Sequence, residues 1–355
     1  MAVSGCGVAG QEHIRAWRNI REVELVAVHD VNEVVARQVA EKWKIKSYYT
    51  DFSEMLRKEE LQIVSIATPP ITHVPLALQA IDAGVNVLIE KPLSTSSEDA
   101  EKLLPLIEKK NVKVTVVNNL LFHESVRKAR KYLKSGSIGK VISCDIHFFV
   151  PSWSVPPDTH WVYKLPGGPL QEPLAHPIYL LQDILGDELE VKDVLISKIG
   201  SHPLVPYDEL RVSLTADNLI GHIHISYNIP RTATYIFIQG TNGAIVLELA
   251  THYYKLIKPV KVTSYIQVLV DTIRQSYYTF ITPTTFGLKK SLKRLKTTHE
   301  ENFRNFLRQV KDEPTEVNIK LESQIKALKI EEEIIRRVHL QLTRSMRTSN
   351  QDSVR

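Results

Sequence analysis

The chain has 355 residues, 43% of them hydrophobic and 24% charged, which suffices for a full core and favours two globular domains over a fibrous or disordered chain. The net charge of +5 is concentrated in residues 289–296 and near the C-terminus, so it does not provide the broad basic face of a nucleic-acid-binding protein. The sequence has only two cysteines, too few for a disulfide framework. No apolar run is long enough to cross a membrane, and no signal peptide is visible. We therefore expect a cytoplasmic protein.

The first 118 residues alternate between short apolar segments and amphipathic helical patterns. The predicted strands are Met1 to Ser4, Val23 to His29, Ser47 to Tyr49, Ile63 to Ala67, Val85 to Ile89 and Val112 to Val117. The predicted helices are Val8 to Ile20, Glu33 to Trp43, Phe52 to Arg57, Ile71 to Ala83 and Ser97 to Lys110. This alternation predicts a doubly wound parallel sheet with right-handed crossovers, so residues 1–118 are expected to form an α/β Rossmann domain.

Beyond Asn118 the βαβ rhythm ends, and residues 119–355 are expected to form an α+β domain with a mostly antiparallel open sheet and helices on one face. The predicted strands are Lys140 to Phe149, Val191 to Ile199, Leu210 to Thr215, Leu219 to Tyr227, Ala233 to Gln239 and Ala244 to Leu249. The predicted helices are Glu124 to Ser135, Leu170 to Leu185, Ser264 to Phe280, Thr298 to Val310 and Ile319 to Leu342, and the polar tail from Thr343 is expected to be frayed.

The first predicted turn has the spacing of a dinucleotide-binding loop. This turn joins a strand to a helix and reads Gly5-Cys6-Gly7-Val8-Ala9-Gly10, which is the pattern G-x-G-x-x-G. Glycines at these positions allow a tight turn and a close approach of the backbone to a pyrophosphate, with the helix N-terminus directed at the negative charge. Asp30 follows the second strand twenty residues later, at the spacing of an acidic side chain that accepts from an adenine ribose. A carboxylate there repels a 2′-phosphate, so NAD is favoured and NADP is the alternative.

The stretch Val85 to Ile89 is an apolar strand that ends in Glu90-Lys91-Pro92. The proline stops the strand, which fixes Lys91 at its carboxyl end. Ligands of open α/β sheets bind at that edge. Lys91 is therefore a candidate for chemistry on whatever meets the nucleotide.

Four motifs occur in the order typical of one family. They are the glycine loop, Thr68-Pro69-Pro70-Ile71-Thr72-His73, Glu90-Lys91-Pro92-Leu93, and Gly167-Gly168 followed by Glu172 and His176. Together they resemble the Gfo/Idh/MocA oxidoreductase family, that of glucose-fructose oxidoreductase and inositol dehydrogenase. The resemblance runs from residue 1 to about 250 and resumes in the helices after Thr298.

The resemblance implies a nicotinamide cofactor on the first domain and hydride transfer at a secondary alcohol of a sugar, sugar nucleotide or cyclitol. Lys91 matches the active-site lysine of the family and His176 its active-site histidine. Glu172 stands where the family usually has aspartate, and Leu174 where it usually has glycine. The resemblance thus indicates an NAD(P)-dependent sugar or polyol dehydrogenase or reductase, and a homodimer or homotetramer.

Hydride removal from a carbinol carbon requires a base for the hydroxyl proton, and His176 suits that role because an unperturbed histidine titrates near pH ~6.5. Glu172 lies one helical turn earlier on the same face, either as a helper or as a structural carboxylate. Lys91 would donate a hydrogen bond to the developing alkoxide.

The predicted cofactor-binding residues come from the loops at one sheet edge. They are Gly5, Gly7, Val8, Ala9, Gly10, Asp30, Thr68, Pro69, His73, Glu90, Lys91 and Asn118. For His73 and Asn118 a purely structural role has equal weight.

Other interpretations stay open at this point. A tightly bound, recycled cofactor would give epimerisation or glycoside elimination, and a non-catalytic scaffold would bind dinucleotide without turnover. His222 and His224 share a strand face, but without a third ligand we predict no metal site. Residues 264–296 combine aromatic and basic residues that would suit an anionic membrane surface, although packing on the protein itself is favoured.

Overall fold

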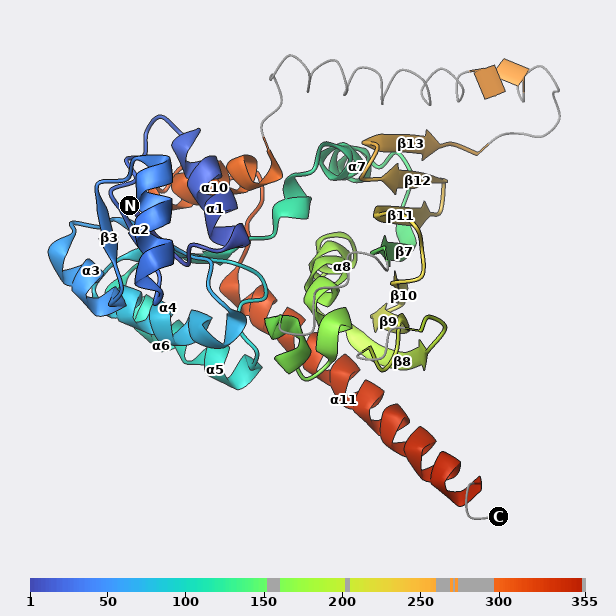
Figure 1. Cartoon of the computed structure of the whole chain (residues 1–355). Helices are drawn as coiled ribbons and strands as arrows, with labels where there is room; N and C mark the ends of the chain where they lie inside the picture. The colour runs from blue at the N-terminus through green and yellow to red at the C-terminus, as the bar shows by residue number, and fades with distance from the viewer. Residues whose placement is uncertain (152–159, 202–204, 260–268, 271, 274–296, 353–355) are drawn as a thin grey trace. The chain divides into compact units, whose positions relative to one another are not determined.

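The structure is a computed structural model that describes residues 1–151, 160–201, 205–259, 269–270, 272–273 and 297–352 (Figure 1). The chain divides into two compact units. The first comprises Met1–Phe122 and Lys296–Lys329, and the second comprises His123–Leu295 and Ile330–Arg355. Each unit is built around its own sheet.

The first unit contains six parallel strands in the order β3-β2-β1-β4-β5-β6, which confirms the predicted Rossmann fold. The strands are β1 (Ala2–Ser4), β2 (Ala27–His29), β3 (Ser47–Tyr49), β4 (Ile63–Ile66), β5 (Asn86–Ile89) and β6 (Val114–Val116). β2 is shorter than predicted because β1 pairs with it only from Ala2 to Ser4.

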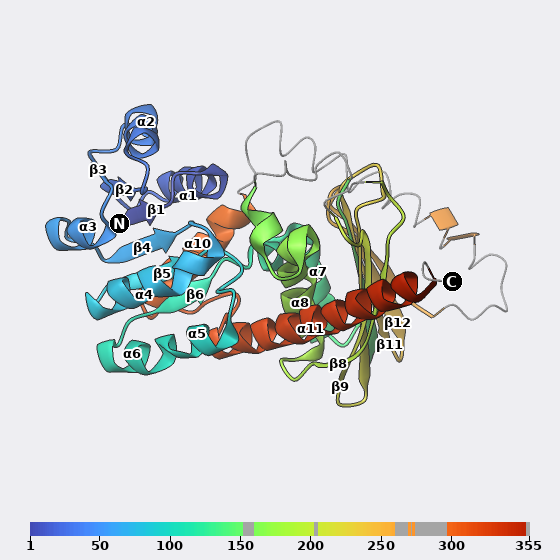
Figure 2. The ribbon, with the colours of Figure 1, turned by 60° about the horizontal axis from the view of Figure 1, so that its bottom comes forward.

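Two helical layers cover this parallel sheet (Figure 2). One layer holds α1 (Val8–Arg18), α2 (Glu33–Trp43) and α10 (Thr298–Val310). The other holds α3 (Phe52–Lys58), α4 (His73–Asp82), α5 (Ser97–Glu101), α6 (Leu103–Lys110) and the start of α11 (Leu321–Asp352). The side chains of Ala2 and Val3 enter opposite layers, because successive residues of a strand point to opposite faces. Both faces of the sheet are therefore apolar.

The C-terminal helices differ from the sequence prediction, which assigned them to the second domain. α10 and the first turns of α11 belong to the first unit. Phe303 of α10 is fully buried, and its ring lies 4.8 Å from that of Trp17 in α1. The reason is that α1 leaves an apolar surface which only a distant part of the chain covers.

The second unit contains seven strands in the order β13-β12-β11-β7-β10-β9-β8. They are β7 (Val141–Phe149), β8 (Glu190–Ser197), β9 (Glu209–Ala216), β10 (Leu219–Ser226), β11 (Ala233–Gly240), β12 (Gly243–Glu248) and β13 (Tyr253–Ile257). Only the β7–β10 pair is parallel, so the mostly antiparallel sheet is confirmed, with β13 as an additional strand. α7 (Glu124–Lys134) and α8 (Gln171–Leu185) lie on the same side of it (Figure 1).

Two predicted helices have different bounds in the structure. The helix expected over residues 97–110 breaks into α5 and α6, because Pro105 has no N–H to donate to the carbonyl of Glu101. α11 continues to Asp352 instead of fraying at Thr343, since extending an existing helix costs much less than starting one. The helix predicted over 264–280 lies outside the described residues except for 269–270 and 272–273, which are helical. No helix in the described ranges has the length and apolarity that a membrane crossing requires.

We predict that Phe303→Ala lowers the free energy of unfolding by about 3 to 5 kcal/mol, because it leaves a cavity between α10 and α1. Urea denaturation of the full chain measures the loss. Val34→Ala is the matched control, since Val34 is 53% exposed on α2 of the same unit. Equal stability of the two variants would contradict the placement of α10 in this core.

Candidate active site

The glycine loop connects β1 to α1, and each of its three glycines meets a different requirement. Gly5 has a φ of +94°, which permits the tight turn. A Cβ on Gly10 would lie 1.8 Å from the carbonyl oxygen of Gly5, so only glycine lets the helix pack this closely on the loop. A Cβ on Gly7 would meet nothing within 4 Å. The backbone at Gly7 therefore presents an open face, as a loop that binds pyrophosphate requires, and Val8 and Ala9 form the first helical turn beside it.

Asp30 lies at the carboxyl end of β2 and is tied to this loop. Its Oδ2 accepts a hydrogen bond of 2.9 Å from the backbone N–H of Cys6, and its Oδ1 accepts one of 3.0 Å from that of Asn32. Burial and the Asp30 charge raise the pKa of the Cys6 thiol to about 12, which leaves the thiol inert. Val31 is 84% exposed directly beside the carboxylate. Asp30 thus both orders the loop and carries acceptor oxygens next to an exposed apolar side chain.

Thr68, Pro69 and His73 follow β4 at the same sheet edge. Pro69 is exposed and Thr68 is half-buried, whereas His73 is fully buried. The His73 ring lies between two carbonyl oxygens, with Nδ1 2.9 Å from that of Pro92 and Nε2 2.8 Å from that of Thr68. Burial lowers the pKa of His73. Its position supports the structural interpretation: the ring joins the loop after β4 to the loop after β5.

Lys91 follows β5 and is half-buried, and its peptide bond to Pro92 is cis. The neighbouring Glu90 carboxylate faces two histidines of the first unit, His13 and His299. The sequence did not single out either histidine. His13 follows the glycine loop by one helical turn, a spacing that could have indicated it, but no local signal connects His299 with residue 90.

Asn118 lies immediately after β6 and is 1% exposed. Its Nδ2 donates a hydrogen bond of 2.9 Å to Oε1 of Gln324 in α11. Its Oδ1 is buried and has no hydrogen-bond partner among the described residues. A buried acceptor without a donor costs stability unless a ligand or water supplies one.

In the second unit, α8 follows the Gly167-Gly168 turn, and several side chains hold that turn in place. The hydroxyls of Tyr207 and Tyr227 donate to the carbonyls of Gly167 and Pro169, at 2.8 and 3.0 Å. The Gly167 N–H donates to the side-chain oxygen of Gln171 at 2.8 Å. These buried contacts fix where α8 begins.

His176 lies in α8 between two aromatic side chains. Its Nδ1 is 2.7 Å from the hydroxyl oxygen of Tyr179, one turn later, and its ring stacks on Phe148 of β7 at 5.4 Å with an interplanar angle of 7°. Neither Tyr179 nor Phe148 was among the residues predicted from the sequence. The i, i+3 spacing of His176 and Tyr179 was a local signal for the first contact, but the second requires the tertiary structure.

Glu172 is half-buried on the same helix. Burial raises the pKa of Tyr227, and the charge of Glu172 raises it further. Leu174, which stands where the family usually has glycine, and the neighbouring Pro173 are both buried. Leu174 is fully buried, so the side chain that replaces glycine contributes to packing.

The remaining candidates do not form a metal centre in the described residues. His224 Nε2 lies 2.8 Å from a Glu209 oxygen and its Nδ1 3.2 Å from that of His147, whereas His222 is exposed and close to Ser213. No group of three or more potential ligands among the described residues is arranged for a metal ion. Most of residues 264–296 lie outside the described residues.

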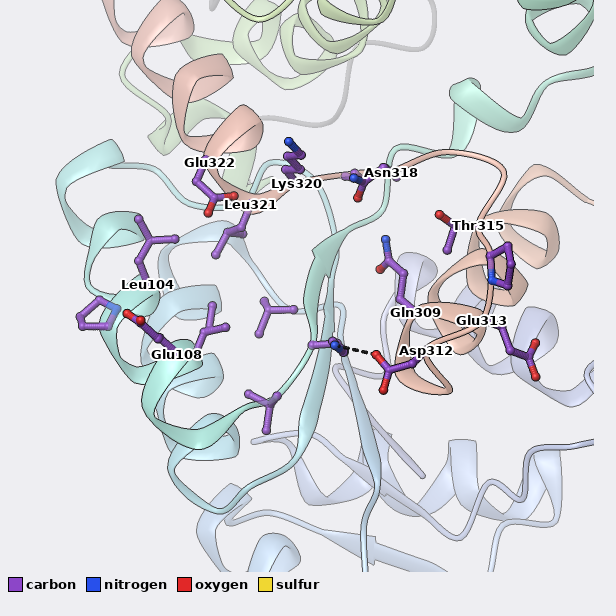
Figure 3. A pocket seen from close by; sticks show the side chains of 17 residues that line it. Leu104, Glu108, Gln309, Asp312, Glu313, Thr315, Asn318, Lys320, Leu321 and Glu322 are labelled. Carbon is purple, nitrogen blue, oxygen red and sulfur yellow. Dashed lines mark ion pairs between the residues drawn. The ribbon is translucent and has the colours of Figure 1, made fainter.

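A groove of about 1010 Å³ opens elsewhere on the first unit, between α6, β6 and the segment that joins α10 to α11 (Figure 3). An ion pair between Lys113 and Asp312, 2.9 Å long, lies within it. The groove contains Val112 to Val114, at the start of β6, and none of the predicted site residues. Dinucleotides bind at the carboxyl ends of such strands, so this groove is separate from the glycine-loop edge.

The predicted residues therefore form two groups. One group lies at the carboxyl edge of the parallel sheet in the first unit and comprises the glycine loop, Asp30, Thr68, Lys91 and Asn118. The other group, Glu172 and His176, lies on α8 of the second unit.

Comparisons with known proteins match two successive parts of the chain. Residues 1–118 match a family model described as an oxidoreductase family with an NAD-binding Rossmann fold, and residues 126–246 match the GFO/IDH/MocA C-terminal domain. D-Apiose dehydrogenase of Paraburkholderia graminis is 31% identical over 39% of this chain and 37% of its own length. Levoglucosan dehydrogenase of Pseudarthrobacter phenanthrenivorans is 25% identical over 62% of this chain and 63% of its own. The chain thus aligns with less than two thirds of each of these relatives.

Solved structures show the same fold. An oxidoreductase from Agrobacterium radiobacter in complex with NAD+, L-tartaric acid and magnesium superposes with a TM-score of 0.74 at 17% identity, over 93% of both chains. The two domain models, matched in order over most of the chain, and this shared fold establish that the protein belongs to the Gfo/Idh/MocA oxidoreductase family and carries its NAD-binding Rossmann domain.

Proposed function

We propose that this protein is an NAD-dependent oxidoreductase that transfers a hydride between nicotinamide and a secondary alcohol of a sugar, sugar nucleotide or cyclitol. The observation that carries the proposal is the open backbone face at Gly7, directly beside the Asp30 carboxylate at the edge where Lys91 lies. Family membership and the dehydrogenase relatives support the same reaction class.

The residues of the first unit fit a bound dinucleotide. Gly7 leaves room for the pyrophosphate in front of the α1 N-terminus. Asp30 would accept from the ribose diol, with Val31 available to cover the adenine face. Asn118 lies at the same edge, immediately after β6, and would lie near the nicotinamide. Bound NAD would supply the hydride acceptor, and side chains of the protein would transfer the hydroxyl proton and stabilise the alkoxide.

We assign the acid–base steps to Lys91 and His176. As the substrate carbon loses its hydride, the hydroxyl proton passes to Nε2 of His176, which requires that Nδ1 carries the other hydrogen and donates it to Tyr179. The Lys91 ammonium would donate to the same substrate oxygen and stabilise the developing alkoxide. Glu172 would favour the protonated histidine by its charge. The reverse reaction returns the same proton to the carbonyl oxygen.

A fluorescence titration with NADH and NADPH tests the proposal, after denaturation has shown whether a nicotinamide copurifies. Binding of NADH, followed by oxidation of a sugar or cyclitol that Lys91→Ala abolishes, is the expected result. Folded, empty protein that binds neither nucleotide would refute it. Cofactor-containing protein that converts a substrate without net NADH formation would favour the recycled-cofactor alternative, and binding without any turnover would favour a scaffold. Sedimentation of the same sample tests for the homodimer or homotetramer that the family implies.

Alanine at Gly7 and at Gly10 should have opposite consequences. Gly7→Ala should leave the melting temperature unchanged, because its Cβ meets nothing within 4 Å, but weaken NADH binding by about tenfold or more by entering the space for the pyrophosphate. Gly10→Ala should cost about 2 to 3 kcal/mol of stability, because its Cβ collides with the Gly5 carbonyl. Thermal melting and NADH titration of both variants check this. Unchanged NADH affinity in Gly7→Ala would contradict the placement of the pyrophosphate.

Asp30→Asn should reduce the preference for NADH over NADPH by about tenfold or more, because it removes the charge that repels a 2′-phosphate. Asparagine keeps a side-chain oxygen for one of the two backbone N–H groups that Asp30 binds, so the loop should stay folded. The ratio of the two dissociation constants is the measurement. Asp51→Asn is the control, because Asp51 caps α3 at a site that binds no nucleotide in this proposal. An unchanged ratio would exclude Asp30 from cofactor selection.

A further inference from the structure

Glu90 is the centre of a charged cluster that draws on three separate parts of the first unit. Its Oε1 lies 3.6 Å from Nε2 of His13 in α1 and 3.9 Å from Nε2 of His299 in α10. Its side chain is 12% exposed, that of His13 is fully buried and that of His299 is 23% exposed. Phe303 closes the cluster, with its ring edge-on to both imidazoles.

The second oxygen of Glu90 contacts the neighbouring lysine. Oε2 accepts a hydrogen bond from the backbone N–H of Lys91. On the other side of the Lys91–Pro92 peptide, Nδ1 of His73 lies 2.9 Å from the Pro92 carbonyl oxygen. The backbone that carries Lys91 is therefore contacted on both sides, by the largely buried side chain of Glu90 and by the buried side chain of His73.

The chemistry of the cluster is consistent with a negative charge on Glu90. Burial opposes its ionisation, but the contacts with His13 and His299 and the charge of Lys91 outweigh this and hold the pKa of Glu90 well below its usual range. Burial lowers the pKa of His13, so this ring is neutral at neutral pH. Its Nδ1 lies 2.8 Å from Oγ of the buried Ser65. Donation from that hydroxyl would leave the ring hydrogen on Nε2, which lies 3.6 Å from the Glu90 carboxylate, beyond hydrogen-bond distance.

We infer that Glu90, His13 and His299 are positioning residues that hold the Lys91 backbone in the orientation needed for its side chain to meet the substrate oxygen. The inference rests on the proposed function, since it gives Lys91 that role. It also assigns Glu90 to the support of Lys91 instead of to contact with the cofactor.

A purely structural role explains the cluster less well. Apolar side chains of similar volume usually stabilise a protein interior at least as well as a buried charged group does. Here a charged group and two imidazoles occupy the space between α1, β5 and α10, immediately before the predicted active-site lysine. Rigid support for a catalytic group is what such a partly buried arrangement provides, with ion-pair contacts on one carboxylate oxygen and a backbone hydrogen bond on the other.

Hydrogen exchange tests the inference without a substrate. In Glu90→Gln, an amide NH2 group replaces one carboxylate oxygen. The substitution also removes the negative charge that both histidines face. We expect amide exchange in the peptide covering residues 90–96 to accelerate about tenfold, while peptides from β4 and α4 remain unchanged. His299→Gln, at the partly exposed position, should give the same local change and serves if Glu90→Gln does not fold. Glu101→Gln is the matched control, because it removes an exposed carboxylate that pairs with Lys329 in the same unit.

The second readout separates this inference from the proposed function. For the substrate found with wild-type protein, Glu90→Gln should lower kcat about tenfold, with KM and the NADH dissociation constant within about twofold of wild type. In a Lys91→Ala background Glu90→Gln should cause no further loss, because it acts through the lysine. Exchange and kcat equal to those of Glu101→Gln would overturn the inference, as would an additive loss in the double variant. Failure of wild-type protein to bind NADH would instead refute the proposed function, and the exchange result would still show whether the cluster holds Lys91.

Discussion

The contact between Gly10 and the carbonyl of Gly5 is the constraint on which the nucleotide edge depends. With no side chain at residue 10, α1 approaches the end of β1 closely enough for the loop between them to turn its backbone outward at Gly7. The same contact fixes how α1 is rotated about its axis and how far it lies from the end of β1. His13 is one turn further along this helix and is therefore carried to Ser65 and Glu90. One close approach thus sets both the glycine loop and the contacts of His13 that we propose support Lys91.

The edge is completed by residues that are distant in sequence. Asp30 from β2 closes the glycine loop, His73 connects the loops after β4 and β5, and His299 reaches Glu90 from α10. α10 can do this because Phe303 and Phe306 bury themselves against α1. The core of the first unit and its functional edge therefore share elements, so the packing of α10 affects the surroundings of Lys91 directly.

The second unit supplies its candidate residues from a single well-supported helix. Two buried tyrosine hydroxyls and Gln171 fix the turn before α8, and Phe148 and Tyr179 hold the His176 ring. Leu174, which stands where the family usually has glycine, and Pro173 lie on the buried side of this helix. The imidazole of His176 has defined partners beside them.

The sequence by itself determined the features that depend on local patterns. Alternating apolar and helical segments predicted the Rossmann fold, the G-x-G-x-x-G spacing located the loop, and the proline after Lys91 placed that lysine at a strand end. Only the tertiary structure decided which distant elements pack together. No local pattern indicates that α10 covers α1, that Glu90 turns toward His13 and His299, or that Asn118 is buried against Gln324. Most of these contacts join residues that are more than 200 positions apart, and as many as 281 between the end of α1 and α10. They form because the fold brings apolar surface and buried polar groups of one part of the chain beside partners from another.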